Sequence, residues 1–202
     1  LATLSKKIGA LLVAEGVRTE AQALAALDNG VDMLEGPFFS HDGEGLTQNI
    51  ENLAARHKTF SLEKSKALQK RVRESESLLS SFVRALAGLP AGEIEHTLVR
   101  LIRENPTVEC LFVLNETGIQ ESETHTRSGV AFKQNALFHP ARPGADHSMK
   151  EYVYLLADSF VNRYRTEPYV SQASGNLCVT LSALFRDGSN TNHILCLDIP
   201  WG

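Results

Sequence analysis

The sequence predicts an α+β fold in which a few helices pack against one antiparallel sheet. Three runs in the last part of the chain have the β-branched and apolar composition of strands, at residues 170–172, 177–185 and 193–199. A long segment with helical spacing of its apolar residues precedes them, at residues 68–89. The first 45 residues differ, because their order of strand, helix and strand is typical of a parallel sheet. We therefore expect a βαβ segment, a long connecting helix and an α+β domain.

The composition argues against several classes of function. The 202 residues include 20 Lys and Arg against 24 Asp and Glu, so the chain offers no large basic surface for nucleic acid. No run of about 18 apolar residues is present, so we expect no membrane span. Cys110, Cys178 and Cys196 each lie in an apolar run, which favours buried free thiols in a reducing compartment. We expect a cytoplasmic protein.

The N-terminal segment has the pattern of one βαβ unit. Short apolar runs at residues 11–13 and 31–34 are the two expected strands. Thr19 is placed to cap the helix between them, and residues 28–30 end that helix. Such a unit cannot bury both faces of its sheet alone, so it is typical of one part of a larger parallel sheet.

Two motifs in this segment carry a resemblance to a known family: the run VAEGVRT at residues 13–19 with Gln22, and the run EGPFF at residues 35–39. Together they resemble the last two strands of an EAL domain, a TIM-like barrel that hydrolyses cyclic-di-GMP. The resemblance implies that Glu15 corresponds to a catalytic glutamate at the metal and water site. It also implies Mg or Mn as the cofactor of a complete EAL domain. The other metal ligands have no counterpart here, so we expect no metal or cofactor and no hydrolysis for this chain alone.

The connecting helix has one apolar edge. Its apolar side chains recur four and three positions apart, which is the spacing of a coiled-coil seam. Two interpretations stand side by side: the seam packs on the domain that follows, or two copies of the chain pair along it. The sequence predicts a homodimer formed through Leu68, Val72, Leu79, Phe82 and Leu86.

The second half of the chain contains further elements before its three last strands. The first expected helix of this half ends before Pro106, because the residue before a proline is disfavoured in the helical conformation. The expected elements are a helix at 92–104, an apolar strand at 108–114, an exposed hairpin partner at 119–126, a loop at 135–147 and a helix at 148–159.

A second resemblance covers this half. The run NPTVECLFVLNETG at residues 105–118 is similar to the opening motifs of PDC or Cache-type sensor domains, which have a PAS-like antiparallel sheet behind a long N-terminal helix. The runs EPYVS at 167–171, SGNLCVTLS at 174–182 and LCLDI at 195–199 resemble the later motifs of that family, in the same order. The resemblance implies a small-molecule ligand, bound between the concave face of the sheet and the segment that crosses it.

Alternation within residues 177–185 separates a core-facing set from a lightly polar set that includes Thr180 and Ser182. Asp198 lies in an otherwise apolar strand, where a carboxylate needs a cation, a ligand amine, several donors or solvent. The alternative is that Asp198 ends the sheet and points outward. Tyrosines suit a pocket wall, because each offers a flat apolar face with a hydroxyl at its tip. The predicted ligand-binding residues are Tyr152, Tyr154, Tyr169, Thr180, Ser182 and Asp198.

Two other clusters are less specific. His139, Asp146 and His147 flank a loop, and we interpret them as an ordinary polar loop rather than a zinc site. Residues 163–165 have the sequence RYR, which suits either an anion clamp or, more commonly, the solvated end of a helix.

The sequence thus predicts three regions: a barrel remnant at 1–45, a linker and connecting helix at 46–90, and a PDC-like sensor domain at 91–202. The predicted function is that of a regulatory module that senses a ligand and dimerises, at the C-terminal end of a bacterial cyclic-di-GMP signalling protein. The alternative is the back end of an active cyclic-di-GMP phosphodiesterase, whose catalytic residues would lie upstream.

Overall fold

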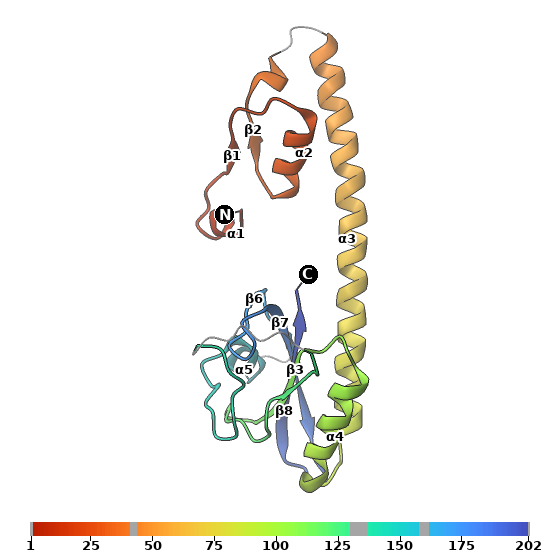
Figure 1. Ribbon diagram of the computed structural model, residues 1–202, viewed down its shortest axis with the longest axis vertical. Coiled ribbons are helices and arrows are strands. Elements are labelled where there is room, and N and C mark those ends of the chain that lie inside the picture. The colour runs from red at the N-terminus through yellow and green to blue at the C-terminus, as the bar shows by residue number, and fades with distance from the viewer. Residues whose placement is uncertain (1, 41–43, 130–136, 158–161, 202) are drawn as a thin grey trace. The chain divides into compact units, whose positions relative to one another are not determined.

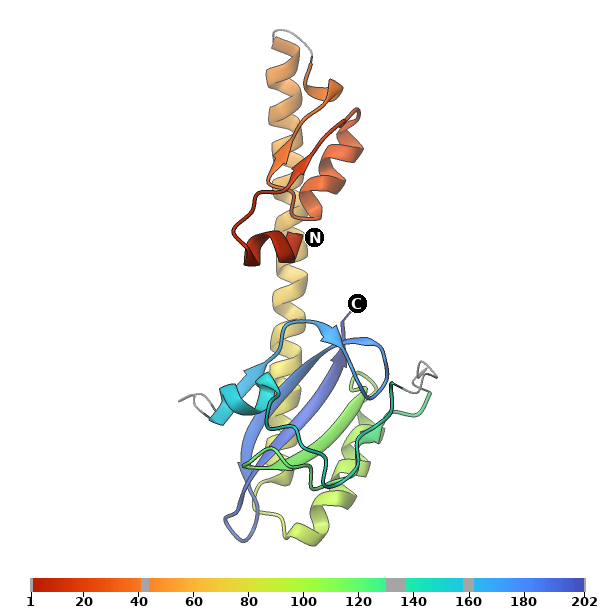
Figure 2. The same ribbon diagram turned by 90° about the vertical axis from the view of Figure 1, so that its left-hand side faces the viewer.

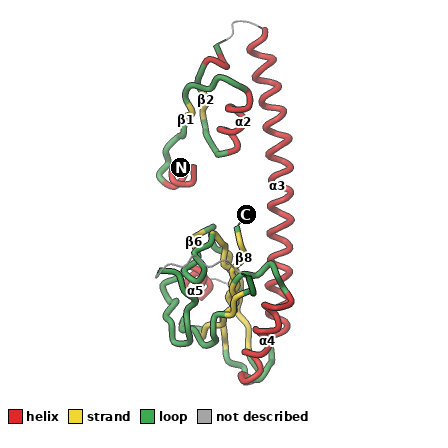
Figure 3. The backbone as a smooth tube through the Cα atoms, in the orientation of Figure 1, coloured by secondary structure: helices red, strands yellow, loops and turns green. Residues whose placement is uncertain are grey.

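The computed structural model describes residues 2–40, 44–129, 137–157 and 162–201 (Figure 1). The chain divides into two compact units, Leu1–Val72 and Arg73–Gly202, each with hydrophobic clusters of its own. The strands of the second unit form one sheet, and the first unit has a two-stranded sheet of its own (Figure 3). The predicted α+β class is confirmed.

The first unit contains the predicted βαβ pattern. Its elements are α1 (Ala2–Lys7), β1 (Val13–Ala14), α2 (Glu20–Asp28), β2 (Met33–Leu34), the 3-10 turn η1 (Pro37–Phe39) and the first part of α3 (Glu44–Leu86). β1 and β2 pair in parallel, with Val13 opposite Met33. Thr19 caps α2 as predicted, because its side-chain oxygen accepts a hydrogen bond from the backbone N–H of Gln22 at 3.2 Å.

Gly36 explains part of the second N-terminal motif. The backbone N–H of Val17 donates to the carbonyl of Glu35 at 2.9 Å, so the chain after β2 passes directly against the chain after β1. A Cβ atom on Gly36 would lie 2.2 Å from the backbone nitrogen of Val17, and the residue has φ 152°. Only glycine fits this close approach.

α3 spans 43 residues, and its last turns belong to the second unit. There Leu79, Phe82 and Leu86 are at most 1% exposed and pack in the core of that unit. The prediction that these three residues form dimer contacts is therefore wrong, because the second unit itself already covers their side chains. The other interpretation of the seam, packing on its own domain, is confirmed for this part of the helix. Leu68, by contrast, is 42% exposed.

The second unit is built around a six-stranded antiparallel sheet (Figure 2). After the end of α3 it contains α4 (Ala91–Glu104), β3 (Cys110–Asn115), β4 (His125–Thr126), α5 (Glu151–Ala157), β5 (Arg163–Arg165), β6 (Tyr169–Val170), β7 (Leu177–Arg186) and β8 (Asn192–Pro200). The strand order is β4-β3-β8-β7-β5, and β6 pairs with one end of β7.

The two faces of this sheet have different partners. On one face, side chains such as Leu181, Leu195 and Leu197 pack with the end of α3 and with α4. On the other, which we call the α5 face, Phe112 and Cys196 pack with residues of α5. The predicted alternation along β7 is confirmed for Leu181, Ala183 and Phe185, whereas Leu177 is 45% exposed. It leaves Thr180 and Ser182 of β7 on the α5 face, together with Asp198 of β8.

Three predicted elements differ from those observed. Residues 119–126 do not form a full exposed hairpin strand: only β4 and two isolated bridges are present, because the buried Gln120 binds a neighbouring loop. Residues 163–165 form β5 rather than the end of a helix, and they pair with β7. The predicted helix at 148–159 is α5 in part, and residues 158 and 159 lie outside the described residues.

Candidate ligand-binding site

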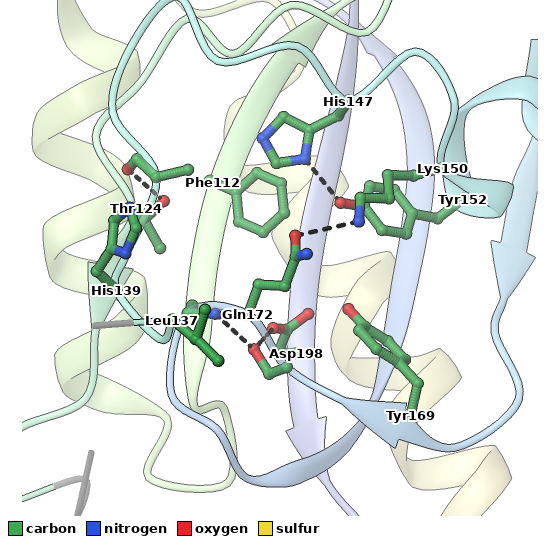
Figure 4. Close-up of a pocket in the computed structure, with 13 residues that line it drawn as sticks. Phe112, Thr124, Leu137, His139, His147, Lys150, Tyr152, Tyr169, Gln172 and Asp198 are labelled. Atoms are coloured by element: carbon green, nitrogen blue, oxygen red, sulfur yellow. Dashed lines mark hydrogen bonds between the residues drawn. The ribbon is translucent and has the colours of Figure 1, made fainter. Parts of the chain in front are cut away.

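A cavity of about 250 Å³ lies against the α5 face of the sheet (Figure 4). Phe112 of β3 and Asp198 of β8 form its floor, and Tyr152 of α5 and Tyr169 of β6 contribute to its walls. The segments before β4, before α5 and after β6 supply the remaining lining residues. The size suits a small metabolite, since cavities that hold drug-sized ligands are usually larger.

Asp198 is the most unusual group in this cavity. The residue is 3% exposed and lies between Cys110 of β3 and Thr180 of β7 in the sheet register. Its carboxylate accepts hydrogen bonds from Thr180 Oγ1 at 2.7 Å and Ser171 Oγ at 3.1 Å. Burial raises the pKa of Asp198 to about 6, although the two hydroxyl groups oppose that rise. The alternative in which this carboxylate points outward at the end of the sheet is therefore wrong.

The hydroxyl groups around Asp198 have a fixed direction of donation. Tyr169 Oη and Thr180 Oγ1 are 2.6 Å apart, and either atom has a hydrogen to give. Because Thr180 uses its hydrogen on Asp198, it must accept from Tyr169. The oxygen of Tyr169 therefore keeps only lone pairs for any further partner.

Asp198 has no cationic partner within the described ranges. The ion pairs found there, at 4 Å or less, lie elsewhere and do not include its carboxylate. Two hydroxyl donors compensate only part of the cost of burying an ionised carboxylate. The Asp198 side chain is therefore poised to gain from a cationic group that enters the cavity.

A second chain of hydrogen-bonded polar groups, separate from the one around Asp198, includes Tyr152 and His147 of the cavity lining. Tyr152 Oη is 2.8 Å from His147 Nδ1, and His147 Nε2 is 3.0 Å from Gln120 Oε1. Burial, followed by the charge of Lys150, lowers the pKa of His147, so its ring is neutral at pH 7. A backbone hydrogen bond holds the segment of His147 in place: its N–H donates to the carbonyl oxygen of Gly118 at 2.8 Å.

Lys150 brings a positive charge to the cavity wall. Its Nζ donates to Gln172 Oε1 at 3.1 Å, and both residues line the cavity. The cavity therefore carries an anionic group on its floor and a cationic group on its wall. Such a pair complements a small molecule with both charges.

The six predicted residues occupy three kinds of position. Tyr152, Tyr169 and Asp198 line the cavity. Thr180 and Ser182 are fully buried behind it, where Thr180 binds Asp198 and Ser182 donates to the carbonyl of Tyr152 at 2.9 Å. Tyr154 is 42% exposed and is not among the lining residues, so the structure does not bring it to the site. Ligand binding by these residues stays a prediction.

Sequence reasoning missed several groups at this site. His147 lines the cavity, although its sequence context suggested an ordinary polar loop. Ser171 and Gln172 follow β6, outside any strand, so the strand predicted at 170–172 is wrong for these two residues. Lys150 lies in the turn before α5, where no periodic pattern shows which way a side chain points. The three cysteines are buried and free, as predicted.

In the first unit, Glu15 directly follows β1 and its side chain is exposed. Within the described residues, no group of three or more His, Cys, Asp or Glu side chains is placed to hold a metal ion. The catalytic role assigned to Glu15 stays a prediction. Among the helices of the described part of the chain, none has the length and hydropathy needed to cross a membrane.

Comparisons with known proteins give structural likeness only. No family model and no curated protein matches the sequence. The Bacillus subtilis YkuI protein, which has an EAL domain and was solved with its substrate c-di-GMP and calcium, matches all of this chain with a TM-score of 0.70 and 17% identity. This chain spans 51% of that protein's chain.

The ligand-binding domain of the Campylobacter jejuni chemoreceptor Tlp3 is also similar. Its structure with isoleucine matches 79% of this chain with a TM-score of 0.56 and 14% identity, and its structure with L-valine matches 79% with a TM-score of 0.55 and 13% identity. The match covers 64% and 65% of those two chains. The predicted combination of folds is confirmed. The chain joins a segment with the fold of an EAL-domain protein to a domain with the fold of a chemoreceptor sensor.

Proposed function

We propose that the second unit senses a small metabolite that carries an ammonium group, within a regulatory module of a bacterial cyclic-di-GMP signalling protein. One observation carries the proposal: the buried Asp198 carboxylate forms part of the cavity floor and, within the described residues, pairs with hydroxyl groups and no cation. An ammonium group would supply the missing charge and up to three N–H donors.

The opposite charge on Lys150 extends this proposal to a zwitterion. A ligand whose ammonium group meets Asp198 would direct a carboxylate toward the cationic wall, as an amino acid does. Phe112 supplies an apolar surface for an aliphatic side chain. The Tlp3 sensor domain, whose fold this unit shares, was solved with isoleucine and with L-valine, which makes aliphatic amino acids the first compounds to test.

The test is a thermal-shift screen of the full chain with the twenty amino acids and two analogues of L-valine. One analogue, 2-hydroxyisovalerate, lacks the amine, and the other, isobutylamine, lacks the carboxylate. A compound present at a hundred times its dissociation constant stabilises the protein by about 2.7 kcal/mol. We expect at least one amine-bearing compound to raise the melting temperature and the amine-free analogue to have no effect.

Two variants make the screen specific. Asp198→Asn keeps the shape of the side chain but removes its charge, so it should abolish the shift. Glu167→Gln removes an exposed carboxylate from the same unit and should leave the shift unchanged. The proposal fails when no compound stabilises the protein, or when a compound stabilises Asp198→Asn as much as the wild type.

The alternative function, the back end of an active phosphodiesterase, concerns a longer protein. It is favoured by the likeness to YkuI, which was solved with its substrate c-di-GMP. We expect this chain to show no hydrolysis of cyclic-di-GMP with Mg or Mn above a Glu15→Ala control. A protein that also contains the upstream part of the barrel tests the alternative directly.

We also propose that the chain forms a homodimer in the cytoplasm. Since Leu79, Phe82 and Leu86 are buried in the second unit, the proposal now depends on the earlier part of α3, where Leu68 is exposed. Sedimentation equilibrium at tens of micromolar should show a dimer, and Leu68→Asp should make it monomeric. A wild-type monomer under those conditions excludes this pairing.

A further inference from the structure

The orientation of the Gln120 side chain is fixed by its partners. Gln120 is 2% exposed, and its Nε2 donates to the carbonyl of Ser122 at 2.8 Å, to Thr124 Oγ1 at 3.0 Å and to the carbonyl of Ala141 at 3.3 Å. Two of these partners are carbonyl oxygens, which only accept. The amide nitrogen must therefore face them, and the amide oxygen must face His147.

This orientation determines which nitrogen of His147 carries the hydrogen. Gln120 Oε1 is an acceptor, so His147 Nε2, 3.0 Å away, is the donor. In a neutral ring the other nitrogen, Nδ1, then has a lone pair. Tyr152 Oη, 2.8 Å from Nδ1, must donate its hydrogen to it.

We propose that Gln120 is a positioning residue that, through His147, sets the hydrogen-bonding polarity of Tyr152 in the cavity and so decides which ligand groups the cavity accepts. Tyr152 uses its only hydrogen on His147, and its oxygen then presents lone pairs alone. Tyr169 is in the same state, because its hydrogen goes to Thr180. With the Asp198 carboxylate, the polar oxygens of these three residues all accept, which selects a ligand group rich in donors. The inference rests on the proposed function, since it assumes that this cavity holds the ligand.

Protonation of His147 would reverse this polarity. The ring would then donate from both nitrogens, and Tyr152 would have to accept from Nδ1 and turn its own hydrogen away. The charged or titratable groups that act on the ring are Lys150, Asp146 and Tyr152, and Gln120 and Phe112 are its neutral neighbours. The Tyr152 hydroxyl would donate to an acceptor group on a ligand only in this protonated state.

The first test measures the His147 tautomer by nitrogen NMR of the imidazole rings at pH 7.5, in the full chain without ligand. A His147→Asn spectrum assigns the signals. We expect hydrogen on Nε2 and a bare Nδ1 in the wild type. In Gln120→Met, which offers no acceptor, the hydrogen should redistribute between the two nitrogens.

Thr124→Val is the matched control. It removes one bond to the Gln120 amide nitrogen and leaves Oε1 in place, so it should loosen the loop without changing the tautomer. A wild-type ring with its hydrogen on Nδ1 overturns the proposal, and so does an unchanged tautomer in a folded Gln120→Met. The wild-type spectrum decides even where that variant does not fold.

The second test compares isobutylamine and isovalerate as probes of the wild type and of Tyr152→Phe. Losing one acceptor should weaken binding of the amine about tenfold, by the energy of a hydrogen bond to a charged group, and leave binding of the carboxylate unchanged. Equal effects on the two probes contradict the inference. If neither probe and no compound of the thermal-shift screen binds the wild type, the proposed function fails, while the NMR result still decides which nitrogen of His147 carries the hydrogen.

Discussion

Asp198→Asn should reveal the cost of keeping an ionised carboxylate in the cavity. Burial raises the pKa of Asp198 from 3.8 to about 6, so the folded protein holds this proton more tightly than the unfolded chain does. A raised carboxyl pKa contributes stability below the unfolded value, and that contribution is lost as the pH rises through the folded value. The relevant window is therefore pH 4 to 6.

The magnitude follows from the size of the shift. A rise of about two pKa units corresponds to a loss on the order of 3 kcal/mol between pH 4 and pH 7.5. Asparagine does not titrate, so Asp198→Asn escapes this loss. We expect the difference in unfolding free energy, variant minus wild type, to increase by about that amount over the same range. Contacts that the substitution changes equally at every pH cancel in this comparison.

Urea unfolding at a series of pH values measures the difference. The chain has one tryptophan, Trp201, which lies in the second unit with the Arg165 guanidinium 5.5 Å from its ring, so its fluorescence reports on this unit. Glu167→Gln, an exposed carboxylate in the same unit, is the control and should track the wild type. The reasoning about Asp198 is refuted if the unfolding free energy of the variant minus that of the wild type is independent of pH, or if it increases as the pH falls.

Two further predictions concern the fold. Leu79→Ala should destabilise the second unit by about 2–5 kcal/mol, because it opens a cavity in a fully buried position. The exposed Leu68 is the control, and Leu68→Ala should cost less than about 1 kcal/mol. Equal losses of unfolding free energy in urea would contradict the assignment of Leu79 to the core. Gly118→Ala should lower the melting temperature, because Gly118 has φ +89° and an added Cβ would lie 2.9 Å from the backbone nitrogen of Ser148; an unchanged melting temperature would show that the loop gives way easily.

The long, periodic elements were predictable from the sequence, because a helix or strand that packs one face on the core repeats its apolar residues at a fixed spacing. β7 alternates between a core-facing set and a polar set, and this pattern located Thr180 and Ser182 on one face. The burial of Leu79 was one of two interpretations that the spacing left open, since a seam looks the same whether its own domain or a second copy covers it.

The rest of the site was not predictable, because it depends on chain segments that meet only in the folded state. Gln120 comes from the turn after β3 and meets His147, 27 residues later, across a loop. Ser171 reaches Asp198 from 27 residues away. Tyr154 was predicted to bind ligand with Tyr152, but residues two positions apart on a helix point in different directions, and only Tyr152 lines the cavity.

The most direct test of the central claim is a titration of the full chain with L-valine, or with the strongest compound from the thermal-shift screen, followed by two-dimensional amide NMR. We predict that the largest shifts come from Ser171, Thr180 and Asp198, that they become stronger as the pH rises through 6 and Asp198 ionises, and that they disappear in Asp198→Asn. Saturable shifts elsewhere in the chain, or shifts at these residues that persist in Asp198→Asn, would contradict an ammonium site at Asp198.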